Sequence, residues 1–140
     1  MAVAGPEPPR SSTWRGGEAL RMARTCYDHL AGRLGVALAD ALLERGHVAL
    51  GSDGGEVTDA GQLFLDAFGA SPAPGRRVFC RPCLDWSERR PHLAGRLGAA
   101  LASRCFELGW VAQQRDTRAL VISEVGWRGF RETFGIVLEN

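Results

Sequence analysis

The chain has 140 residues, 17 basic and 16 acidic side chains, a formal net charge of +1 and 45% hydrophobic residues. This is the composition of an ordinary globular protein that is long enough to build a core, and the near-neutral charge points to no particular partner. Every basic residue is Arg, which suits bidentate contacts to phosphate or carboxylate but also follows from a GC-rich coding sequence.

Residues 1–17 are rich in Pro, Gly and Ser and predict a flexible leader. They lack the basic and apolar regions of a signal peptide, and no apolar run in the chain has the length of a membrane span. The expected compartment is therefore the cytoplasm. Four cysteines, at 26, 80, 83 and 105, are expected to be reduced thiols, available for metal binding, redox chemistry or packing.

An internal repeat organises the chain. The heptapeptide HLAGRLG occurs at 29–35 and again at 92–98. Residues 29–48 and 92–111 are identical at 13 of 20 positions, namely the heptapeptide, then Ala-Leu-Ala, then Glu, Gly and Val. Similar segments follow each copy, at 57–69 and 121–135. This degree of likeness indicates a duplication.

Each copy predicts a helix, a two-stranded wing and a second helix. In the first copy Leu recurs at 30, 34, 38 and 42, the spacing of one helix face, and Gly46 ends the helix. A wing is expected at 47–50 and 56–57, and Thr58 is expected to cap the last helix. The second copy repeats this order, with apolar residues at 93, 97, 101 and 105, Gly109, wing strands at 111–113 and 119–122, and Ser123.

The expected fold class is therefore α+β, mainly helical, with two tandem winged-helix-like repeats packed as one body. The expected boundaries are a leader at 1–17, repeat one at 18–70, a linker at 71–82, repeat two at 83–137 and a tail at 138–140. The first helix could also start early, because apolar residues from Leu20 to Ala41 follow a heptad spacing. One continuous helix over 18–45 would expose a long stripe that a second chain could cover, which predicts a homodimer.

Three segments resemble a known family. They are ARTCYDHLAGRLGVAL at 23–38, CLDWSERRPHLAGRLGAAL at 83–101 and GFRETFGI at 129–136. Together with a helix that ends in ERGHV or ELGWV, a wing and VTDAG, they resemble the C-terminal, sensor region of ArsR-type winged helix-turn-helix transcriptional regulators. The resemblance covers about residues 18–137. It implies a dimeric DNA-binding regulator with a small-molecule or metal effector, and it leaves out the usual N-terminal winged helix that reads DNA.

Metal-ligating residues form the first group of candidates. Cys26, Asp28 and His29 would share one face if the long helix is continuous, and thiolate with imidazole suits zinc, copper(I) or trivalent arsenic. Cys80, Cys83 and Asp85 include the spacing of half a zinc site. If the repeats pack with pseudo-twofold symmetry, both groups approach each other. Ser87 is expected to cap the second long helix with Pro91 in its first turn, so the duplicated ligands would not be geometrically equivalent.

The same region supplies two further sets of candidates. An effector pocket could be lined by Asp85, Trp86, Arg89, Arg90, His92 and His29, with an anionic effector near the arginines. DNA contacts could come from Arg89, Arg90 and Arg96 at a helix start and from Arg115 and Arg118 on the second wing. Each residue also has a structural interpretation as a core or solvated side chain.

No nucleophile elbow, phosphate-binding loop or zinc-protease motif occurs, so no enzyme is expected. The leading hypothesis is the effector-sensing and dimerisation part of an ArsR-type regulator. The alternatives are an autonomous DNA-binding winged-helix protein and a Cys/His metal- or metalloid-binding protein.

Overall fold

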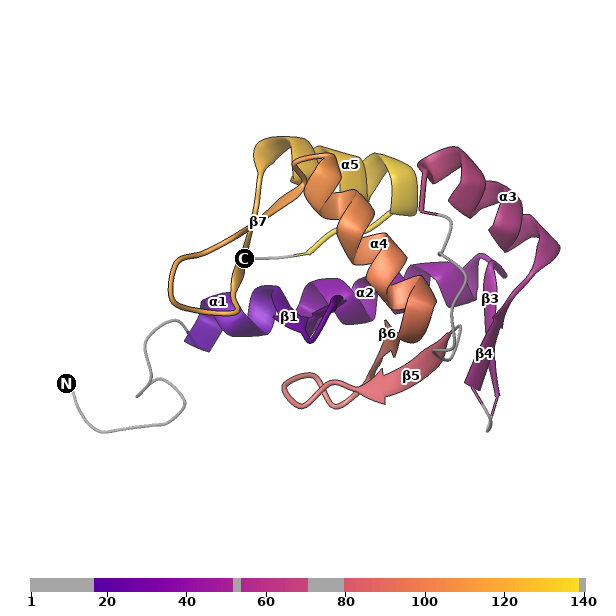
Figure 1. Cartoon of the computed structure of the whole chain (residues 1–140), viewed down its shortest axis with the longest axis horizontal. Coiled ribbons are helices and arrows are strands. Elements are labelled where there is room, and N and C mark those ends of the chain that lie inside the picture. The colour runs from indigo at the N-terminus through magenta and orange to yellow at the C-terminus, as the bar shows by residue number, and fades with distance from the viewer. Residues whose placement is uncertain (1–16, 52–53, 71–79, 139–140) are drawn as a thin grey trace.

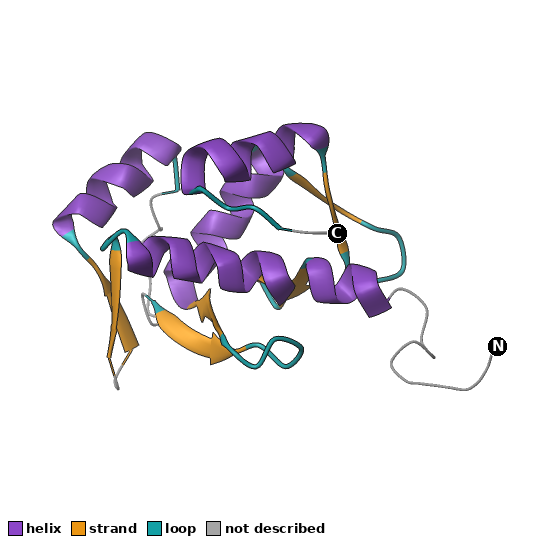
Figure 2. Cartoon of the chain, turned by 180° about the vertical axis from the view of Figure 1, so that it is seen from behind, coloured by secondary structure: helices purple, strands orange, loops and turns teal. Residues whose placement is uncertain are grey.

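The computed structural model describes residues 17–51, 54–70 and 80–138. Residues 1–16 of the leader expected at 1–17, residues 71–79 of the expected linker and the last two residues of the tail lie outside the described residues. In the described ranges the chain forms five helices and eight strands, and the strands pair into four two-stranded antiparallel sheets (Figures 1 and 2). The expected α+β class is confirmed.

Both copies of the repeat have the same order of elements: a hairpin, a long helix, a second hairpin and a final helix. A short helix, α1 (Gly17–Met22), precedes the first copy. The first copy contains β1 (Arg24–Cys26), β2 (His29–Ala31), α2 (Gly32–Glu44), β3 (Val48–Gly51), β4 (Gly54–Val57) and α3 (Asp59–Phe68). The second contains β5 (Arg81–Leu84), β6 (Pro91–Ala94), α4 (Gly95–Glu107), β7 (Val111–Gln113), β8 (Leu120–Ile122) and α5 (Glu124–Phe134).

The wings and the caps of the final helices form as the sequence predicts. The Thr58 hydroxyl accepts a hydrogen bond from the Gly61 amide at 3.0 Å, and Ser123 accepts one from Gly126 at 2.9 Å. Gly46 and Gly109, each with φ +72°, follow the ends of α2 and α4. These local signals are strong because each depends on one side chain or one backbone angle.

The expected continuous helix over 18–45 is wrong. The chain leaves the helical path at Ala23 and forms the β1–β2 hairpin, in which Tyr27 has φ +59° and is 92% exposed. Apolar residues at heptad spacing therefore belong to three different elements and form no continuous stripe. The heptad argument for a homodimer loses its structural basis.

The expected start of the second long helix is also wrong. Ser87 lies in the β5–β6 loop, and Pro91 is the first residue of β6, a position in a strand where a missing N–H is tolerated. The helix begins four residues later, at Gly95. A hairpin thus precedes the long helix in both copies, and the winged pattern expected from the sequence did not contain it.

The heptapeptide folds as a sharp strand-to-helix corner. Its first Gly, Gly32 or Gly95, has φ +78° or +80°, an angle that other residues rarely adopt, and it turns the strand into the helix. Two residues after these glycines, Leu34 and Leu97 are fully buried. In each repeat the corner therefore joins the long helix directly to the hairpin that precedes it.

The two corners pack on each other, so that each long helix contacts the hairpin of the other repeat. The second Gly of the heptapeptide lies at this contact: a Cβ on Gly35 would lie 3.4 Å from the Cβ of His92, and one on Gly98 would lie 3.1 Å from that of His29. The closest approach of either Cβ, at 2.4 Å, would be to a carbonyl oxygen of its own repeat, that of Leu30 or Leu93. The space between the helices, lined by Leu30, Gly35, Leu38, Leu93, Gly98 and Leu101, measures about 10 Å³. It has room for one water at most.

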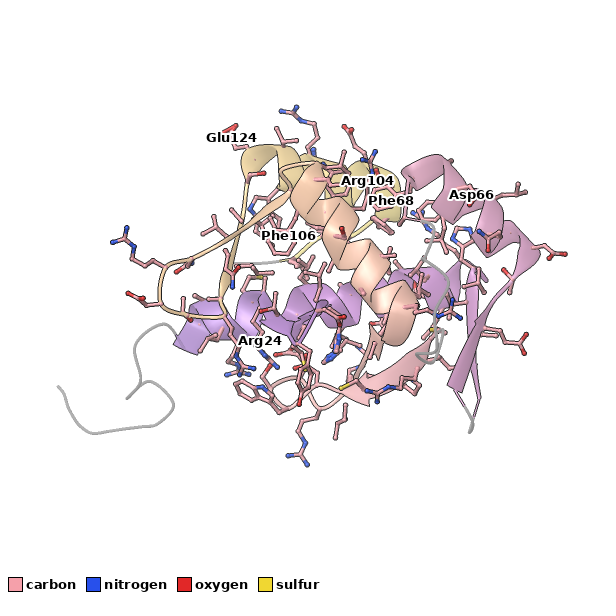
Figure 3. All side chains as sticks on the ribbon, in the orientation of Figure 1. Arg24, Asp66, Phe68, Arg104, Phe106 and Glu124 are labelled. Carbon is pink, nitrogen blue, oxygen red and sulfur yellow. The ribbon has the colours of Figure 1, made fainter. Side chains whose placement is uncertain are left out.

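Arginines join each long helix to the final helix of the other repeat. Arg104 of α4 donates to the Phe68 carbonyl at the end of α3 over 2.7 Å (Figure 3), and Arg45, after α2, donates to the Thr133 carbonyl of α5 over 2.7 Å. Cations at helix C-termini satisfy the last carbonyls and complement the helix dipole. The repeats are thus tied together at the C-terminal ends of both long helices.

The large aromatic side chains of the final helices and of Trp110 form part of the core. Phe68 packs on Trp110 with ring centroids 5.5 Å apart, and Trp110 packs edge-to-face on Phe130 at 4.9 Å. The contact between Phe68 and Trp110 again joins the two repeats. None of the helices in the described ranges combines the length and the apolar character that a membrane crossing needs.

Replacing Gly98 with Ala tests the tight corner between β6 and α4, which also lies against His29 of the other repeat. The new Cβ would lie 2.4 Å from the Leu93 carbonyl oxygen, and overpacking of this kind costs roughly 1–3 kcal/mol. We expect the free energy of unfolding, measured by urea denaturation, to fall by that amount. The matched control is Ser103→Ala on the exposed face of the same helix, where the change should stay within about 0.5 kcal/mol. Equal stabilities of both variants would contradict the packing described.

Candidate metal centre

The first hairpin of each repeat brings a cysteine and a histidine side by side. Cys26 is paired with His29 across β1 and β2, and Cys83 is paired with His92 across β5 and β6. Paired residues in an antiparallel ladder project from the same face of the sheet. The two hairpins therefore present the same two ligand types, although their loops differ in length. The expectation that the duplicated ligands are not equivalent is wrong for the strands that carry them.

The packing of the corners places the four side chains at one point between the repeats. One ligand atom from each of Cys26, His29, Cys83 and His92 lies within 4.8 Å of all the others. The two Nε2 atoms are 3.1 Å apart, and both imidazoles are buried. Because each repeat supplies one thiol and one imidazole, the cluster, which we call the Cys2His2 centre, exists only where the repeats meet.

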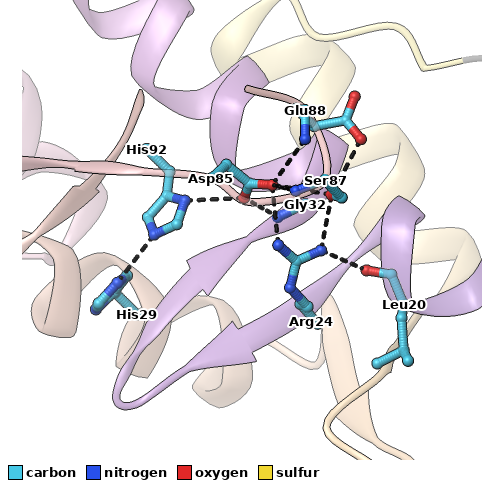
Figure 4. A network of polar contacts seen from close by, with 8 residues as sticks. All are labelled: Leu20, Arg24, His29, Gly32, Asp85, Ser87, Glu88 and His92. Atoms are coloured by element: carbon cyan, nitrogen blue, oxygen red, sulfur yellow. Dashed lines mark hydrogen bonds and ion pairs between the residues drawn. The ribbon is translucent and has the colours of Figure 1, made fainter. Parts of the chain in front are cut away.

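A buried carboxylate holds one of these imidazoles in place. Oδ2 of Asp85 lies 2.9 Å from Nδ1 of His92 and also accepts the Gly32 amide at 2.6 Å. Oδ1 accepts hydrogen bonds from Nη2 of Arg24 and from the Ser87 hydroxyl, each over 2.9 Å. It also accepts hydrogen bonds from the backbone amides of Ser87 and Glu88, each over 3.1 Å (Figure 4). Asp85 thus joins elements of both repeats around His92.

The ionised state of Asp85 fixes the tautomer of His92. Burial by itself would raise the pKa of Asp85, but the hydrogen bonds from Gly32, Ser87 and Glu88 and the charge of Arg24 hold that pKa well below its usual range. The carboxylate is therefore ionised and can only accept. His92 must then carry its proton on Nδ1, so that a lone pair on Nε2 faces His29.

His29 has a weaker version of the same environment. Oδ1 of Asp28 lies 3.5 Å from Nδ1 of His29, which is too long for a good hydrogen bond. If His29 carries its proton on Nδ1, two lone pairs face each other over 3.1 Å. If it carries the proton on Nε2, a bare buried Nδ1 faces a carboxylate. A cation between the two Nε2 atoms removes this conflict, since both imidazoles then keep Nδ1–H next to a carboxylate.

The pKa shifts favour neutral imidazoles. Burial lowers the pKa of His29, and the facing His92 lowers it further. Burial also lowers the pKa of His92, although Asp85 acts in the opposite direction. A neutral imidazole is the form that binds a metal ion. Burial and the neighbouring Cys83 raise the pKa of the Cys26 thiol, so binding a metal ion there would release protons.

The donor atoms fit a metal ion of ordinary size. Zinc is bound by sulfur at about 2.3 Å and by nitrogen at about 2.0–2.1 Å, so a tetrahedral site has edges of roughly 3.4 Å between nitrogens and 3.8 Å between sulfurs. The observed separation of the Nε2 atoms is 3.1 Å. Cys26, His29, Cys83 and His92 are therefore the residues that could hold the ion, with Asp85 and Asp28 behind the imidazoles.

Cys80 lies apart from this group. Its side chain is fully buried, burial raises the pKa of its thiol to about 11, and its carbonyl accepts the Gly55 amide at 2.9 Å. The Cys80-x-x-Cys83 spacing suggested half a zinc site, but in the structure Cys83 is brought together with Cys26 and the two histidines instead. Cys105 is also fully buried, with the pKa of its thiol raised to about 12 by burial.

Some of the residues expected to line an effector pocket belong to the Asp85 network, and the others lie near the surface. Trp86 is half exposed, and the Arg24 guanidinium lies 4.0 Å above its ring. Arg90 pairs with Asp40 at 2.9 Å near the surface, and Arg89 occupies the β5–β6 loop with φ +61°. Neither arginine stands at a helix start. Trp86 and Arg24 thus belong to the surroundings of the Asp85 network, and Arg90 pairs away from it.

The DNA-contact candidates lie at three separate places. Arg89 and Arg90 are in the β5–β6 loop, and Arg96 is in the first turn of α4. Arg115 and Arg118 are exposed in the loop between β7 and β8. The sequence did not single out Arg24, whose buried pairing with Asp85 spans 61 positions and has no local signal.

Comparison with known proteins finds a likeness to a transcriptional regulator. The chain is 42% identical over 120 residues to the uncharacterized HTH-type transcriptional regulator YdfF of Bacillus subtilis (strain 168). The match covers 84% of this chain and 53% of the relative, so the chain spans about half the length of that protein. No protein-family model matches the chain, and no solved structure matches it either. The likeness supports the class of transcription regulators.

Replacing Arg24 with Met tests the buried network. The change leaves the Asp85 carboxylate buried without its cation, and breaking such a pair costs roughly 3–5 kcal/mol. We expect a loss of that size in the free energy of unfolding. Arg90→Met is the control, because the Arg90–Asp40 pair is largely exposed and its loss should cost less than about 1 kcal/mol. Similar losses in the free energy of unfolding of both variants would show that the buried Arg24–Asp85 pair stabilises the fold no more than the exposed pair does.

Proposed function

We propose that this chain is the effector-sensing and dimerisation part of a bacterial ArsR-type transcriptional regulator, and that its effector is a thiophilic metal ion bound at the Cys2His2 centre. The observation that carries the proposal is the convergence of four ligand atoms within 4.8 Å, two from each repeat. A duplicated corner that places the same two ligand types on both sides of one point is a natural way to build a four-ligand site.

The resemblance and the comparison support the regulatory part of the proposal. The regulator YdfF is about twice as long as the matched segment, which is consistent with a separate winged helix that reads DNA. In this proposal the two halves, 18–70 and 83–137, are winged-helix-like repeats that have become a sensor body. DNA is then bound by the whole regulator, in the cytoplasm, as a homodimer.

A metal ion suits the contact between the two repeats better than an organic effector does. The space between the long helices is about 10 Å³, far below the size of a pocket for an organic ligand. The aromatic side chains Phe68, Trp110 and Phe130 contact each other and form core. The buried polar groups that converge between the repeats are thiols and imidazoles, which are ligands for soft and borderline ions.

Titration with zinc or cobalt tests the proposal. We expect the purified chain, stripped of metal, to bind one ion, with cobalt producing thiolate charge-transfer absorption. Cys26→Ser and Cys83→Ser should each weaken binding strongly, because each removes one of four ligands. The matched control is Cys80→Ala, which removes the other cysteine of the Cys80-x-x-Cys83 spacing and should bind like the wild type.

The same titration gives the outcomes that contradict the proposal. Wild-type protein that binds neither ion, or binding that depends on Cys80 as much as on Cys26, would rule out the Cys2His2 centre as the effector site. Bound metal should also raise the thermal midpoint, because an ion that binds only the folded chain at 100 times its Kd adds about 2.7 kcal/mol.

Arg115 and Arg118 give a reason to test the alternative of autonomous DNA binding, because both are exposed on the second wing. If DNA binding belongs to the rest of the regulator, a gel shift with random duplex at low salt should show no complex with this chain. A salt-dependent complex that Arg115→Ala and Arg118→Ala weaken would favour the alternative, since each lost phosphate contact lowers the salt slope by about one.

A further inference from the structure

We infer that the Cys2His2 centre takes a single divalent ion of the zinc class, and that Asp85 is the positioning residue that fixes His92 for it. This inference rests on the proposed function, because it names the ion and the residue behind one ligand of the same site. It separates the thiophilic ions that suit two thiols and two imidazoles from those that do not.

The donor set distinguishes zinc from trivalent arsenic and copper(I). Copper(I) and trivalent arsenic are thiophilic ions that prefer sulfur ligands. The centre offers two thiols, Cys26 and Cys83, and Cys80 is not part of the group. Two thiolates with two imidazoles are a donor set of tetrahedral zinc.

The separation of the ligands favours one ion over a two-iron cluster. In a Rieske-type cluster the two thiolates bind one iron and the two imidazoles bind the other, which separates sulfur from nitrogen. Here all four atoms lie within 4.8 Å of each other. With all four positions filled by protein ligands, the ion would have no open position for a substrate, as in structural and regulatory zinc sites.

Asp85 is placed to orient a ligand and not to bind the ion itself. Both of its oxygens are already used: Oδ2 by His92 and Gly32, Oδ1 by Arg24, Ser87 and the Glu88 amide. A histidine that binds a metal ion through Nε2 commonly donates Nδ1–H to a carboxylate, which fixes the ring and raises its basicity. His92 has this partner at 2.9 Å.

The first repeat provides an internal comparison. Asp28 occupies the corresponding place, but it is partly exposed and lies 3.5 Å from Nδ1 of His29. The duplicated site is therefore asymmetric, with one imidazole held by a buried charged network and the other next to a solvated carboxylate. Since Asp85 also binds Gly32 and Arg24 of the first repeat, the orientation of His92 depends on the contact between repeats.

Metal affinities of two aspartate variants test the inference. Loss of a carboxylate behind a metal-binding histidine costs roughly 10- to 100-fold in affinity, so Asp85→Asn should raise the Kd for zinc and cobalt by that factor. Asp28→Asn is the matched control and should change the Kd by less than about threefold, because its exposed carboxylate lies 3.5 Å from Nδ1 of His29, too long for a good hydrogen bond. Arsenite, titrated in competition, should not displace zinc from the wild type.

A second measurement separates orientation from folding. Asp85→Asn leaves Arg24 buried without its partner and could unfold the chain, so the double variant Arg24→Met with Asp85→Asn removes both charges. Nitrogen-15 NMR of the histidines in metal-free protein reports the tautomer directly. We expect His92 to carry its proton on Nδ1 in the wild type and to shift toward Nε2 in the double variant, with a matching rise in Kd.

The outcomes distinguish this inference from the proposed function. Unchanged affinity and an unchanged tautomer in the double variant would refute the role of Asp85 while the metal site stands. Arsenite that binds more tightly than zinc would refute the ion class alone. Failure of the wild type to bind any of these ions would instead refute the proposed function.

Discussion

The structure depends on the close approach of two identical corners, each made of a hairpin, a glycine turn and a long helix. Gly35 and Gly98 have no side chain, and each lies against a carbonyl of its own hairpin, at Leu30 or Leu93, and against the Cβ of the His of the opposite repeat. Because this contact brings the helices together, the other links between repeats follow from it: the aromatic core around Trp110, and the arginines that reach across to the opposite final helices. A single heptapeptide, used twice, therefore specifies a local turn and a tertiary contact.

The same contact produces the chemistry of the centre. Two imidazoles that pack through their Nε2 edges at 3.1 Å, with a carboxylate behind each of them, form an arrangement that neutral tautomers cannot fully satisfy. Buried polar groups that are left in conflict cost stability unless they are compensated. A bound ion compensates both imidazoles and both thiols at once and joins the repeats. In the proposed function, binding of the effector is thereby linked to the contact between the two repeats.

Much of the fold could be predicted from the sequence, because its signals are local or repeated. The duplication, the wings, the Thr58 and Ser123 caps and the glycines after the long helices all depend on neighbouring residues. The first hairpins could not be predicted, because their strands have three or four residues and apolar residues at heptad spacing run through one of them. Pro91 is compatible with a helix start or with the start of a strand, and only the tertiary contact decides. The candidate ligands Cys26, His29 and Cys83 were identified by type. Their convergence was expected from pseudo-symmetry, whereas Arg24 and the role of Ser87 beside Asp85 depend on contacts between distant segments.

X-ray absorption at the zinc edge of the loaded protein tests the central claim most directly, because it counts the ligand types around the ion. Two corners that meet at one point predict a shell of two sulfurs at about 2.3 Å and two nitrogens at about 2.0–2.1 Å, with the outer scattering of imidazole rings. A shell of oxygens alone, or of one histidine with a single thiolate, would mean that the ion does not bind both repeats and would contradict the account.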